Sequence, residues 1–343
     1  MSLLCSFKSI MKRFNAVFYK RCCINENSLI RYGHHLMNKI NLSFIVSLVI
    51  ITLGYLAKRF HVVKESDGDG LSRIVLNFTL PATVITVFST IQLDKSLFLI
   101  PFINIMYCSL LASVAFFIFR KQPREEKGML TMQFASFNIG LFAYPLIEAT
   151  WGSSGLKYFG MFDMGNSLMT FGAAYIIACL HSAHHEKISY GRLIFRALTA
   201  VPFLAYVTTL VLSVLNLSYP PFFLSICSII AKANMPMSLL LLGIFLSFSF
   251  ETKHWKRLLQ ILAVRYSLGI SVGLLLYMLL PFDKMFRITL LLGFCLPISL
   301  SVVPYAVECG YDKKFVGTVN NATIVISFIV MWVGVLLVQQ GIL

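Results

Sequence analysis

The chain has 343 residues, of which 58% are hydrophobic and only 13% are charged. A soluble domain carries about 25% charged residues, so this composition excludes an ordinary soluble protein and indicates one embedded in the lipid bilayer. The formal net charge is +15. Because the cations lie in short connections between apolar segments and not on one basic face, we expect no nucleic acid partner.

Residues 1–41 form a basic N-terminal extension. They contain a single acid, Glu26, and the cations Lys8, Lys12, Arg13, Lys20, Arg21, Arg31 and Lys39. The segment lacks the apolar stretch of about 7–15 residues that a signal peptide needs, although its composition also fits an organelle-targeting sequence. We expect the native protein to begin at Met37, with the sequence MNKINLSFIVSLVIITLGYLAKRF, so that residues 1–36 would not belong to it.

Apolar runs of about 18 to 28 residues, separated by charged breaks, predict ten transmembrane helices. Their approximate ranges are 42–60, 71–91, 97–119, 128–150, 156–180, 194–216, 221–249, 255–280, 287–310 and 315–339. The first five form one repeat, residues 42–180, and the last five form a second repeat, residues 194–340. The sequence therefore predicts an all-α membrane protein with two five-helix halves.

The cations are distributed unevenly between the two sides of the membrane. The connections on one side hold few of them: Lys95, Lys157, Lys284 and Arg287. The connections on the other side hold many more, among them Arg124, Lys256 and Lys313. Cytoplasmic loops carry the excess of Lys and Arg, so we expect both ends of the ten-helix core outside the cell, with the plasma membrane as the location.

Two pairs of prolines indicate that the second half repeats the first. Helix 2 reads NFTLPATVI and helix 7 reads KANMPMSLL, and Pro81 and Pro236 lie 155 residues apart. Helix 4 reads GLFAYPLIEATWG and helix 9 reads SLSVVPYAVECG, and Pro145 and Pro304 lie 159 residues apart. Because five helices is an odd number, a duplicated second half must enter the membrane in the opposite orientation.

Breaks in matching helices of an inverted repeat are typical of the binding site of a secondary transporter. Proline interrupts the helix and frees backbone N–H and C=O groups at membrane depth, where they must find other partners. The breaks at residues 138–145 and 297–304 can therefore line a cavity, and the N-terminal ends of the half-helices favour an anion. A structural kink is the alternative for one proline, but two matched pairs favour a binding site.

Five motifs are distinctive. They read NFTLPATVITVFST in helix 2, FNIGLFAYPL in helix 4, GMFDMGNSLMTF in helix 5, NMPMSLLLLGIFLS in helix 7 and CLPISLSVVPYAVECGYD in helix 9. Across residues 42–340 the chain resembles the auxin efflux carrier family. The resemblance implies a 5+5 inverted repeat in which the broken helices 4 and 9 cross beside the substrate site, at Asn138, Pro145 and Pro304. It also implies a homodimer, with helices 1, 2, 6 and 7 as a scaffold and helices 3–5 and 8–10 as a mobile domain.

The chain is closer to the compact microbial members of this family than to the plant members. A short connection, HSAHHEKISYGR, joins helices 5 and 6 in place of the long central cytoplasmic loop of the plant members. Ser299 and Ser301 in helix 9 also depart from the plant pattern. The similarity to microbial members implies a small organic acid, such as malate or malonate, as the substrate.

Lys232 lies near the middle of helix 7, where a charge costs about 2.5 to 3.5 kcal/mol. It matches Asn77 in the repeat, since each stands four residues before its proline. We expect Lys232 to attract a substrate carboxylate, and the alternative is a structural pair with an acid.

Further polar side chains complete the predicted site. Asn138 and Asn166 offer donors and acceptors to a carboxylate or a coupling cation, or alternatively hydrogen bonds between helices. Asp163 either exchanges a proton or is a charge at a helix end, and Arg265 is expected to extend to the cytoplasmic surface. The predicted substrate-binding residues are Asn77, Asn138, Gly140, Pro145, Asp163, Asn166, Lys232, Ser299, Ser301 and Pro304.

These features predict a secondary transporter that moves a small organic anion by alternating access, with H⁺ or Na⁺ as the coupling ion. A sodium-coupled symporter of similar architecture and a membrane sensor that binds a ligand without moving it are the alternatives. The sequence contains no nucleophile elbow, P-loop or zinc-binding helix motif. We therefore expect no enzyme activity, no catalytic residue, no metal site and no cofactor.

Overall fold

The computed structural model describes residues 26–89, 94–183, 191, 195, 198–247 and 255–343. Two compact units make up the chain, Met1–Ser43 and Phe44–Leu343. In the first unit, the residues from Glu26 onward are helical. The second unit holds the other helices and the candidate site.

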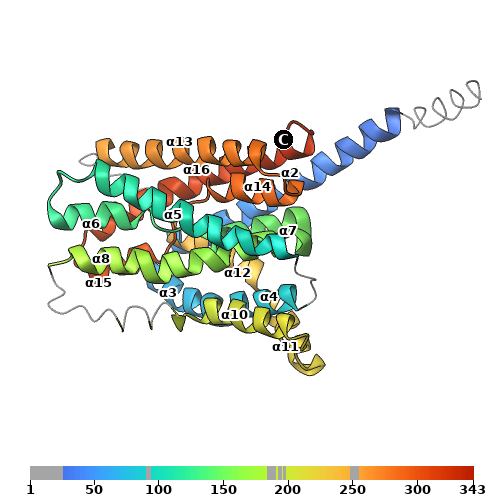
Figure 1. The fold of residues 1–343 in the computed structure, drawn as a ribbon, viewed down its shortest axis with the longest axis horizontal. Coiled ribbons are helices and arrows are strands. Elements are labelled where there is room, and N and C mark those ends of the chain that lie inside the picture. The colour runs from blue at the N-terminus through green and yellow to red at the C-terminus, as the bar shows by residue number, and fades with distance from the viewer. Residues whose placement is uncertain (1–25, 90–93, 184–190, 192–194, 196–197, 248–254) are drawn as a thin grey trace, which may run out of the picture. The chain divides into compact units, whose positions relative to one another are not determined.

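The regular structure of the described residues is helical, and they contain no strand (Figure 1). The helices of the first half are α2 (Glu26–Arg59), α3 (Glu65–Ile74), α4 (Leu80–Phe88), α5 (Leu99–Ile118), α6 (Arg124–Met132), α7 (Tyr144–Leu168) and α8 (Tyr175–His181). Those of the second half are α10 (Val201–Val214), α11 (Pro221–Ala231), α12 (Asn234–Phe245), α13 (Trp255–Leu279), α14 (Lys284–Gly293), α15 (Val302–Glu308) and α16 (Lys313–Gln339). Short π-helical or 3₁₀ segments extend some of them: η1 (Val75–Thr79), η2 (Lys95–Phe98), η3 (Ile139–Ala143) and η4 (Met169–Ala174). The predicted all-helical class is confirmed.

Six of the predicted spans contain helical segments that are long and apolar enough to cross a membrane. Within the described residues these segments are Asn41–Arg59, Glu65–Phe88, Ser96–Ile118, Pro221–Phe245, Trp255–Leu279 and Lys313–Gln339. In the predicted sixth span, α10 is apolar but shorter, with 14 residues. Several such segments in one chain are typical of a protein that crosses the bilayer repeatedly. The count of ten helices stays a prediction.

The predicted fourth, fifth and ninth spans are built from shorter pieces. Non-helical residues 133–138 separate α6 from η3 and α7, and non-helical residues 294–301 separate α14 from α15. The helix α7 continues from the fourth predicted span into the fifth and bends at Gly152, where φ is 61° and ψ is −150°. Glycine adopts such a positive φ at little cost, so the turn between these two spans lies at this residue.

Each of the four matched prolines lies in the first turn of a helix. Pro81 and Pro145 are the second residues of α4 and α7, and Pro236 and Pro304 are the third residues of α12 and α15. At Pro236 and Pro304 a helix begins after non-helical residues, so the missing N–H costs no helical bond. Pro81 and Pro145 instead follow the π-helical segments η1 and η3 directly, where the hydrogen-bond pattern of a continuous helix changes. The prolines therefore mark where a helical piece begins.

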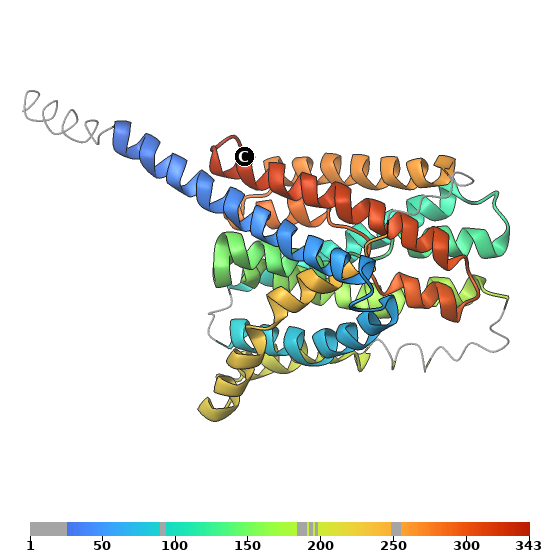
Figure 2. The ribbon, with the colours of Figure 1, turned by 180° about the vertical axis from the view of Figure 1, so that it is seen from behind.

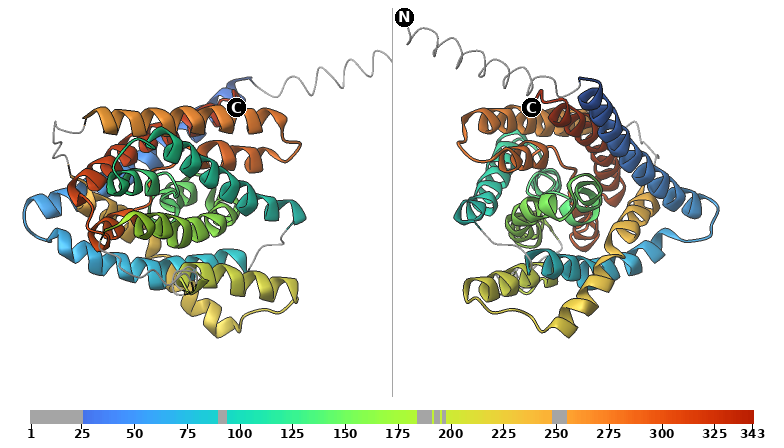
Figure 3. Two further views of the ribbon diagram at one scale, coloured as in Figure 1. Left: turned by 60° about the vertical axis from the view of Figure 1, so that its left-hand side comes forward. Right: turned by 90° about the vertical axis from the view of Figure 1, so that its right-hand side faces the viewer.

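The helices of the second unit can be grouped into two sets, which also pack against each other where α12 contacts η3 and α7. The flanking set contains residues 44–59 of α2 together with α3, α4 and α10–α12; α4 packs against α10 and α11, and α3 packs against α12. The crossing set contains α5–α8 and α13–α16; α5 and α14 pack against α7, and α6 packs against α8. Figures 1 and 2 show α3, α4, α10 and α11 side by side beneath the crossing set, and Figure 3 shows the same grouping from two other sides.

Within the flanking set, α2 and α12 touch backbone to backbone. A Cβ atom on Gly243 would lie 2.0 Å from the Ile51 carbonyl oxygen, and one on Gly54 would lie 2.2 Å from the Leu240 carbonyl oxygen. Small residues allow this kind of close approach between membrane helices. The two glycines therefore fix α2 against α12.

Hydrogen bonds from side chains follow the division into two sets. Bonds within the crossing set include Arg124 to Leu180, Ser182 to Cys309, Tyr266 to Thr323 and Tyr311 to Ala178. Bonds within the flanking set include Lys58 to Leu246 and Thr79 to Asn234. Bonds that join the described parts of the two sets include Tyr206 to Asp163, Tyr144 to Tyr206 and Asn321 to Ser247.

Candidate functional site

The breaks in the two interrupted segments touch each other. The Asn138 N–H donates a hydrogen bond of 2.8 Å to the Pro297 carbonyl. Both residues lie in the breaks that the sequence predicts, and both are buried. A backbone bond between two such breaks fixes the point at which the interrupted segments meet, which is called the crossing below.

Side-chain amides bond to the backbone of both breaks. Asn166 donates to the Phe137 carbonyl at 2.9 Å and accepts from the Phe137 N–H at 2.8 Å. Asn320 donates to the Ile298 and Ser299 carbonyls, each at 3.1 Å. Backbone groups outside a helix need partners of this kind at membrane depth, so the two amides stabilise the breaks.

Arg265 on α13 holds the ends of α6 and α14 together. Its guanidinium donates to the carbonyls of Gln133 at 3.1 Å, Ser136 at 2.9 Å and Leu296 at 3.4 Å, and lies 4.4 Å from the centre of the Phe137 ring. The C-terminal end of a helix is the negative end of its dipole, which favours a cation. The prediction that Arg265 extends to the surface is wrong: its side chain is fully buried, because these carbonyls replace water.

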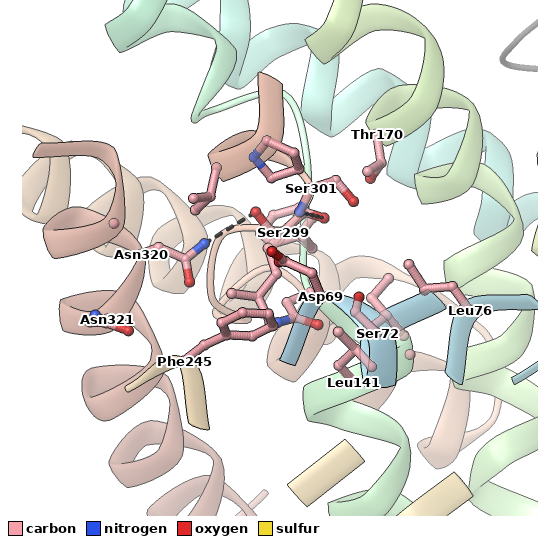
Figure 4. Close-up of a pocket in the computed structure, with 18 of the residues that line it drawn as sticks. Asp69, Ser72, Leu76, Leu141, Thr170, Phe245, Ser299, Ser301, Asn320 and Asn321 are labelled. Atoms are coloured by element: carbon pink, nitrogen blue, oxygen red, sulfur yellow. Dashed lines mark hydrogen bonds between the residues drawn. The ribbon is translucent and has the colours of Figure 1, made fainter. Parts of the chain in front are cut away.

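A cavity of about 660 Å³ lies beside the crossing. Its wall includes residues of α3, η3, α7, η4, α15, α16, the two breaks and the end of α12, and Figure 4 shows side chains from several of these elements converging on it. The predicted site residues that line it are Asn138, Gly140, Asp163, Asn166, Ser299, Ser301 and Pro304. The fold therefore brings together residues that are far apart in the sequence.

Three predicted site residues lie elsewhere. Lys232 follows the last residue of α11, and its side chain is exposed. Asn77 is also exposed, and its amide donates to the Arg73 carbonyl at 2.8 Å. Pro145 is buried in the first turn of α7 and does not line the cavity. These three side chains make no described contribution to the cavity wall.

One end of the cavity is charged and exposed. Glu65 and Asp69 come from the first two turns of α3, and Lys313 and Lys314 come from the first turn of α16. All four are exposed, whereas Asn138 at the crossing is buried. The cavity thus leads from charged surface residues to the broken backbone.

Buried polar atoms without a partner lie in the wall of the cavity. Within the described part of the chain these are Nδ2 of Asn138, Oγ1 of Thr170 and Oδ1 of Asn320. The amide of Asn320 is oriented by its two carbonyl acceptors, so its free atom is the oxygen. Buried polar atoms are normally hydrogen-bonded, and a cavity that offers free donors and acceptors is suited to a polar ligand.

Asp163 lies deep in the same wall. Its side chain is 5% exposed, so the alternative of a solvated charge at a helix end does not hold. Its Oδ2 accepts a hydrogen bond from the Tyr206 hydroxyl at 2.8 Å, and its Oδ1 accepts one from Asn166 at 3.3 Å. The hydroxyl groups of Tyr206 and Tyr144 also bond to each other.

The sequence analysis missed several residues of the wall, including Asp69, Thr170, Lys313 and Asn320. A signal for Asn320 was present: it lies 154 residues after Asn166, close to the spacing of Pro81 and Pro236. Asp69 and Lys313 stand in charged connections, where a residue that lines a cavity cannot be told from one that faces water. Thr170 carried no signal.

Comparisons with known proteins show the family to which the chain belongs. A model of the membrane transport protein family matches residues 42–335. An uncharacterized transporter from Methanothermobacter thermautotrophicus is 26% identical over 207 residues, which are 59% of this chain and 67% of that protein. A second uncharacterized transporter, from Methanocaldococcus jannaschii, is 24% identical over 216 residues, which are 59% of this chain and 68% of that protein. Since the family match contains both breaks and the whole cavity, the chain belongs to the membrane transport protein family, the auxin efflux carrier-like family that its motifs indicate.

Proposed function

We propose that the protein is a secondary transporter that carries a small organic anion across the membrane by alternating access. The observation that carries this proposal is the cavity at the crossing, where the amide of Asn138 offers a buried donor without a partner. Membership of a membrane transport family supports the general function. The substrate class is inferred from the chemistry of the cavity.

The size and polarity of the cavity suit a small organic acid. Its volume of about 660 Å³ falls within the range of about 300–1,000 Å³ that is typical of ligand pockets. Donors for a carboxylate are the amide of Asn138, the hydroxyls of Ser299 and Ser301, and the N–H groups at the start of η3. The exposed end of the cavity carries the ammonium groups of Lys313 and Lys314 together with the carboxylates of Glu65 and Asp69.

The proposed architecture is a ten-helix, 5+5 inverted repeat. Asn166 and Asn320 support it, since they lie 154 residues apart and each stabilises the break of its own half. Thr79 and Asn234 lie 155 residues apart and bond to each other at 3.0 Å. Equivalent residues of two repeats meet in this way near a pseudo-twofold axis.

In the proposed mechanism, the crossing set moves against the flanking set. The cavity lies between them, since Asp69 and Phe245 come from the flanking set and Asn138 and Ser299 come from the crossing set. The distribution of Lys and Arg assigns the exposed end of the cavity to the cytoplasm, so this conformation would be inward-facing. Location in the plasma membrane and a homodimer through the flanking set complete the proposal.

Counterflow in liposomes tests the proposed function. Purified protein is reconstituted into liposomes loaded with an unlabelled acid, and labelled malonate, malate, other short carboxylates or indole-3-acetate is supplied outside. The proposal predicts saturable exchange of at least one of these acids above that of protein-free liposomes. Folded, reconstituted protein that exchanges none of them would contradict the organic-anion substrate.

A further inference from the structure

Asp163 is a buried carboxyl group with uncharged partners. Its described hydrogen bonds come from the hydroxyl of Tyr206 and the amide of Asn166. The ion pairs found among the described residues do not include it. Because a buried carboxylate without a cation is strongly disfavoured, such a group favours the binding of a proton or a cation.

The elements that pack against α7 bring no compensating charge to Asp163 in the part of the chain that the structure describes. The segments α4, α12, η3 and η4 contain no titratable side chain, and Tyr206 is the titratable residue of α10. The titratable side chains of α5 and α14 are Tyr107, Cys108, Lys284 and Arg287. The Cys108 thiol bonds to Asn104, and Lys284 and Arg287 donate to backbone carbonyls away from Asp163. The Tyr107 ring stacks on Phe294, and its neutral hydroxyl has no described partner. The side chain of Lys95 in η2 lies outside the described part. The charged residues of the cavity itself stand at its exposed end.

Tyr206 forms a link between the two sets of helices. It belongs to α10 of the flanking set, whereas Asp163 and Tyr144 belong to α7 of the crossing set. When Asp163 is ionised, its carboxylate accepts a hydrogen bond from the Tyr206 hydroxyl, which accepts one from the Tyr144 hydroxyl. When Asp163 is protonated, its carboxyl group can donate to the Tyr206 hydroxyl, which can then donate to Tyr144, so both hydrogen bonds run in the opposite direction. Both protonation states are therefore satisfied as long as α7 stays beside α10.

Movement of α7 past α10 affects the two states differently. An ionised Asp163 would lose the hydrogen bond from the Tyr206 hydroxyl while it is still buried. The Asn166 amide would then be its remaining described donor, and that amide is shared with the backbone of Phe137. A protonated Asp163 would lose only a hydrogen bond between neutral groups. The protonated form therefore moves at a lower cost.

We propose that Asp163 binds the coupling ion of the transporter, a proton, and that the Tyr206 link holds the two sets together until Asp163 is protonated. The inference rests on the proposed transport function. The proton would pass from water in the cavity to the Asp163 carboxylate and return to water on the other side. An organic anion in the same cavity disfavours a second negative charge, so anion and proton bind with positive linkage and are carried in the same direction.

The test uses the acid that exchanges in counterflow, with labelled malonate and malate as the first probes. Liposomes are clamped at zero membrane potential with K⁺ and valinomycin, and the outside is made one pH unit more acidic than the inside. The inference predicts that the accumulation ratio rises about tenfold for each proton carried with the anion. An equivalent Na⁺ gradient at equal pH is expected to drive no accumulation.

Two variants separate the carboxyl group from the link. Asp163→Asn is expected to lose both the accumulation driven by the pH gradient and the pH dependence of exchange. Tyr206→Phe keeps the carboxyl group but removes a donor to its ionised form, so the pH of half-maximal exchange is expected to move upward. Tyr219→Phe is the matched control, because Tyr219 bonds to Thr209 within the flanking set, and it should keep the wild-type pH profile.

Several results would overturn the inference. Wild-type protein that exchanges the acid but ignores the pH gradient would show that no proton is coupled. Accumulation driven by a Na⁺ gradient alone would show that the coupling ion is Na⁺ and not a proton. Accumulation by Asp163→Asn at the wild-type level would show that Asp163 does not bind the coupling ion. If Asp163→Asn does not fold, the inference is still tested by accumulation in the wild type under the pH gradient and by the pH dependence of exchange in Tyr206→Phe. Failure of counterflow itself would contradict the proposed function, and the inference would fall with it.

Discussion

Asn166 and Asn320 act as substitutes for backbone at the crossing. Asn166 satisfies both the N–H and the C=O of Phe137, and Asn320 satisfies two successive carbonyls of the other break. An amide side chain carries a donor and an acceptor, which allows one residue to do this. The backbone groups of each break that lack helical partners are thereby stabilised by protein atoms in place of water.

Replacement of Asn166 by alanine leaves both groups of Phe137 without their described partner. We expect Asn166→Ala to lower the free energy of unfolding by about 1–3 kcal/mol, which is the usual cost of a buried unsatisfied polar group. The thermal midpoint in detergent micelles measures the effect. Asn77→Ala, at an exposed position, is the control and should change the midpoint little. Equal midpoints for the two variants would contradict the assigned role.

The sequence predicted the residues of the crossing better than it predicted the direction of other side chains. Asn138, Ser299 and Ser301 stand in or beside breaks, and the position of a break follows from its proline. Lys232 lies in the short turn between α11 and α12, and its position in the sequence does not show the direction in which its side chain points. The structure places it away from the cavity.

The half-helices of the interrupted segments differ in the polarity of the ends that they bring to the crossing. Carbonyls at and just after the ends of α6 and α14 are bound by Arg265, whereas η3 begins at the crossing with its N–H groups. The cation therefore neutralises the negative ends and leaves the positive ends to the cavity. This arrangement favours an anion in the cavity.

Arg265→Lys tests the connection between α6 and α14. Lysine keeps the charge but offers a compact ammonium in place of the planar fork of donors, so it cannot reach all three carbonyls. We expect the free energy of unfolding to fall by about 2 kcal/mol or more, which a thermal midpoint would show. Lys256→Gln, at an exposed position on the same helix, is the control. A midpoint as high as that of the control would show that Arg265 does not hold the two ends.

For the helices, the sequence predicted the positions of the breaks but not the continuity of the segments on either side. The prolines of α12 and α15 lie where a helix begins after non-helical residues, because proline fits the first turn of a helix. Those of α4 and α7 lie directly after the π-helical segments η1 and η3. The continuation of α7 through two predicted spans was missed, because apolar periodicity does not show the backbone conformation of Gly152. Arg265 was misplaced because the carbonyls that bind it come from other segments.

At the largest scale, the flanking set and the crossing set of the second unit line one cavity. The bonds between them include those of Tyr206 and that of Asn321 to the Ser247 carbonyl at 3.2 Å. Matched prolines predicted the two repeats, but the division into sets came from the family resemblance, because a sequence repeat does not show which helices move together. Which helices move together stays a prediction.

A cross-link between the sets should stop transport. The double variant Ser247→Cys and Asn321→Cys places two thiols at the bond between α12 and α16, and oxidation is expected to reduce exchange at least tenfold, with recovery after reduction. The control is Ser182→Cys opposite the native Cys309, since both belong to the crossing set and Ser182 donates to the Cys309 carbonyl at 2.8 Å. Transport that persists with the α12–α16 cross-link formed would contradict relative movement of the sets.

The most direct test of the central claim compares counterflow by Asn138→Ala with that by Asn77→Ala. Asn138 supplies the unpartnered donor at the crossing, whereas Asn77 lies outside the cavity. If the organic anion binds at the crossing, Asn138→Ala will weaken the apparent affinity for the exchanged acid at least tenfold, which corresponds to about 1.4 kcal/mol, and Asn77→Ala will behave like the wild type. Wild-type affinity in a folded Asn138→Ala variant would show that the substrate binds elsewhere.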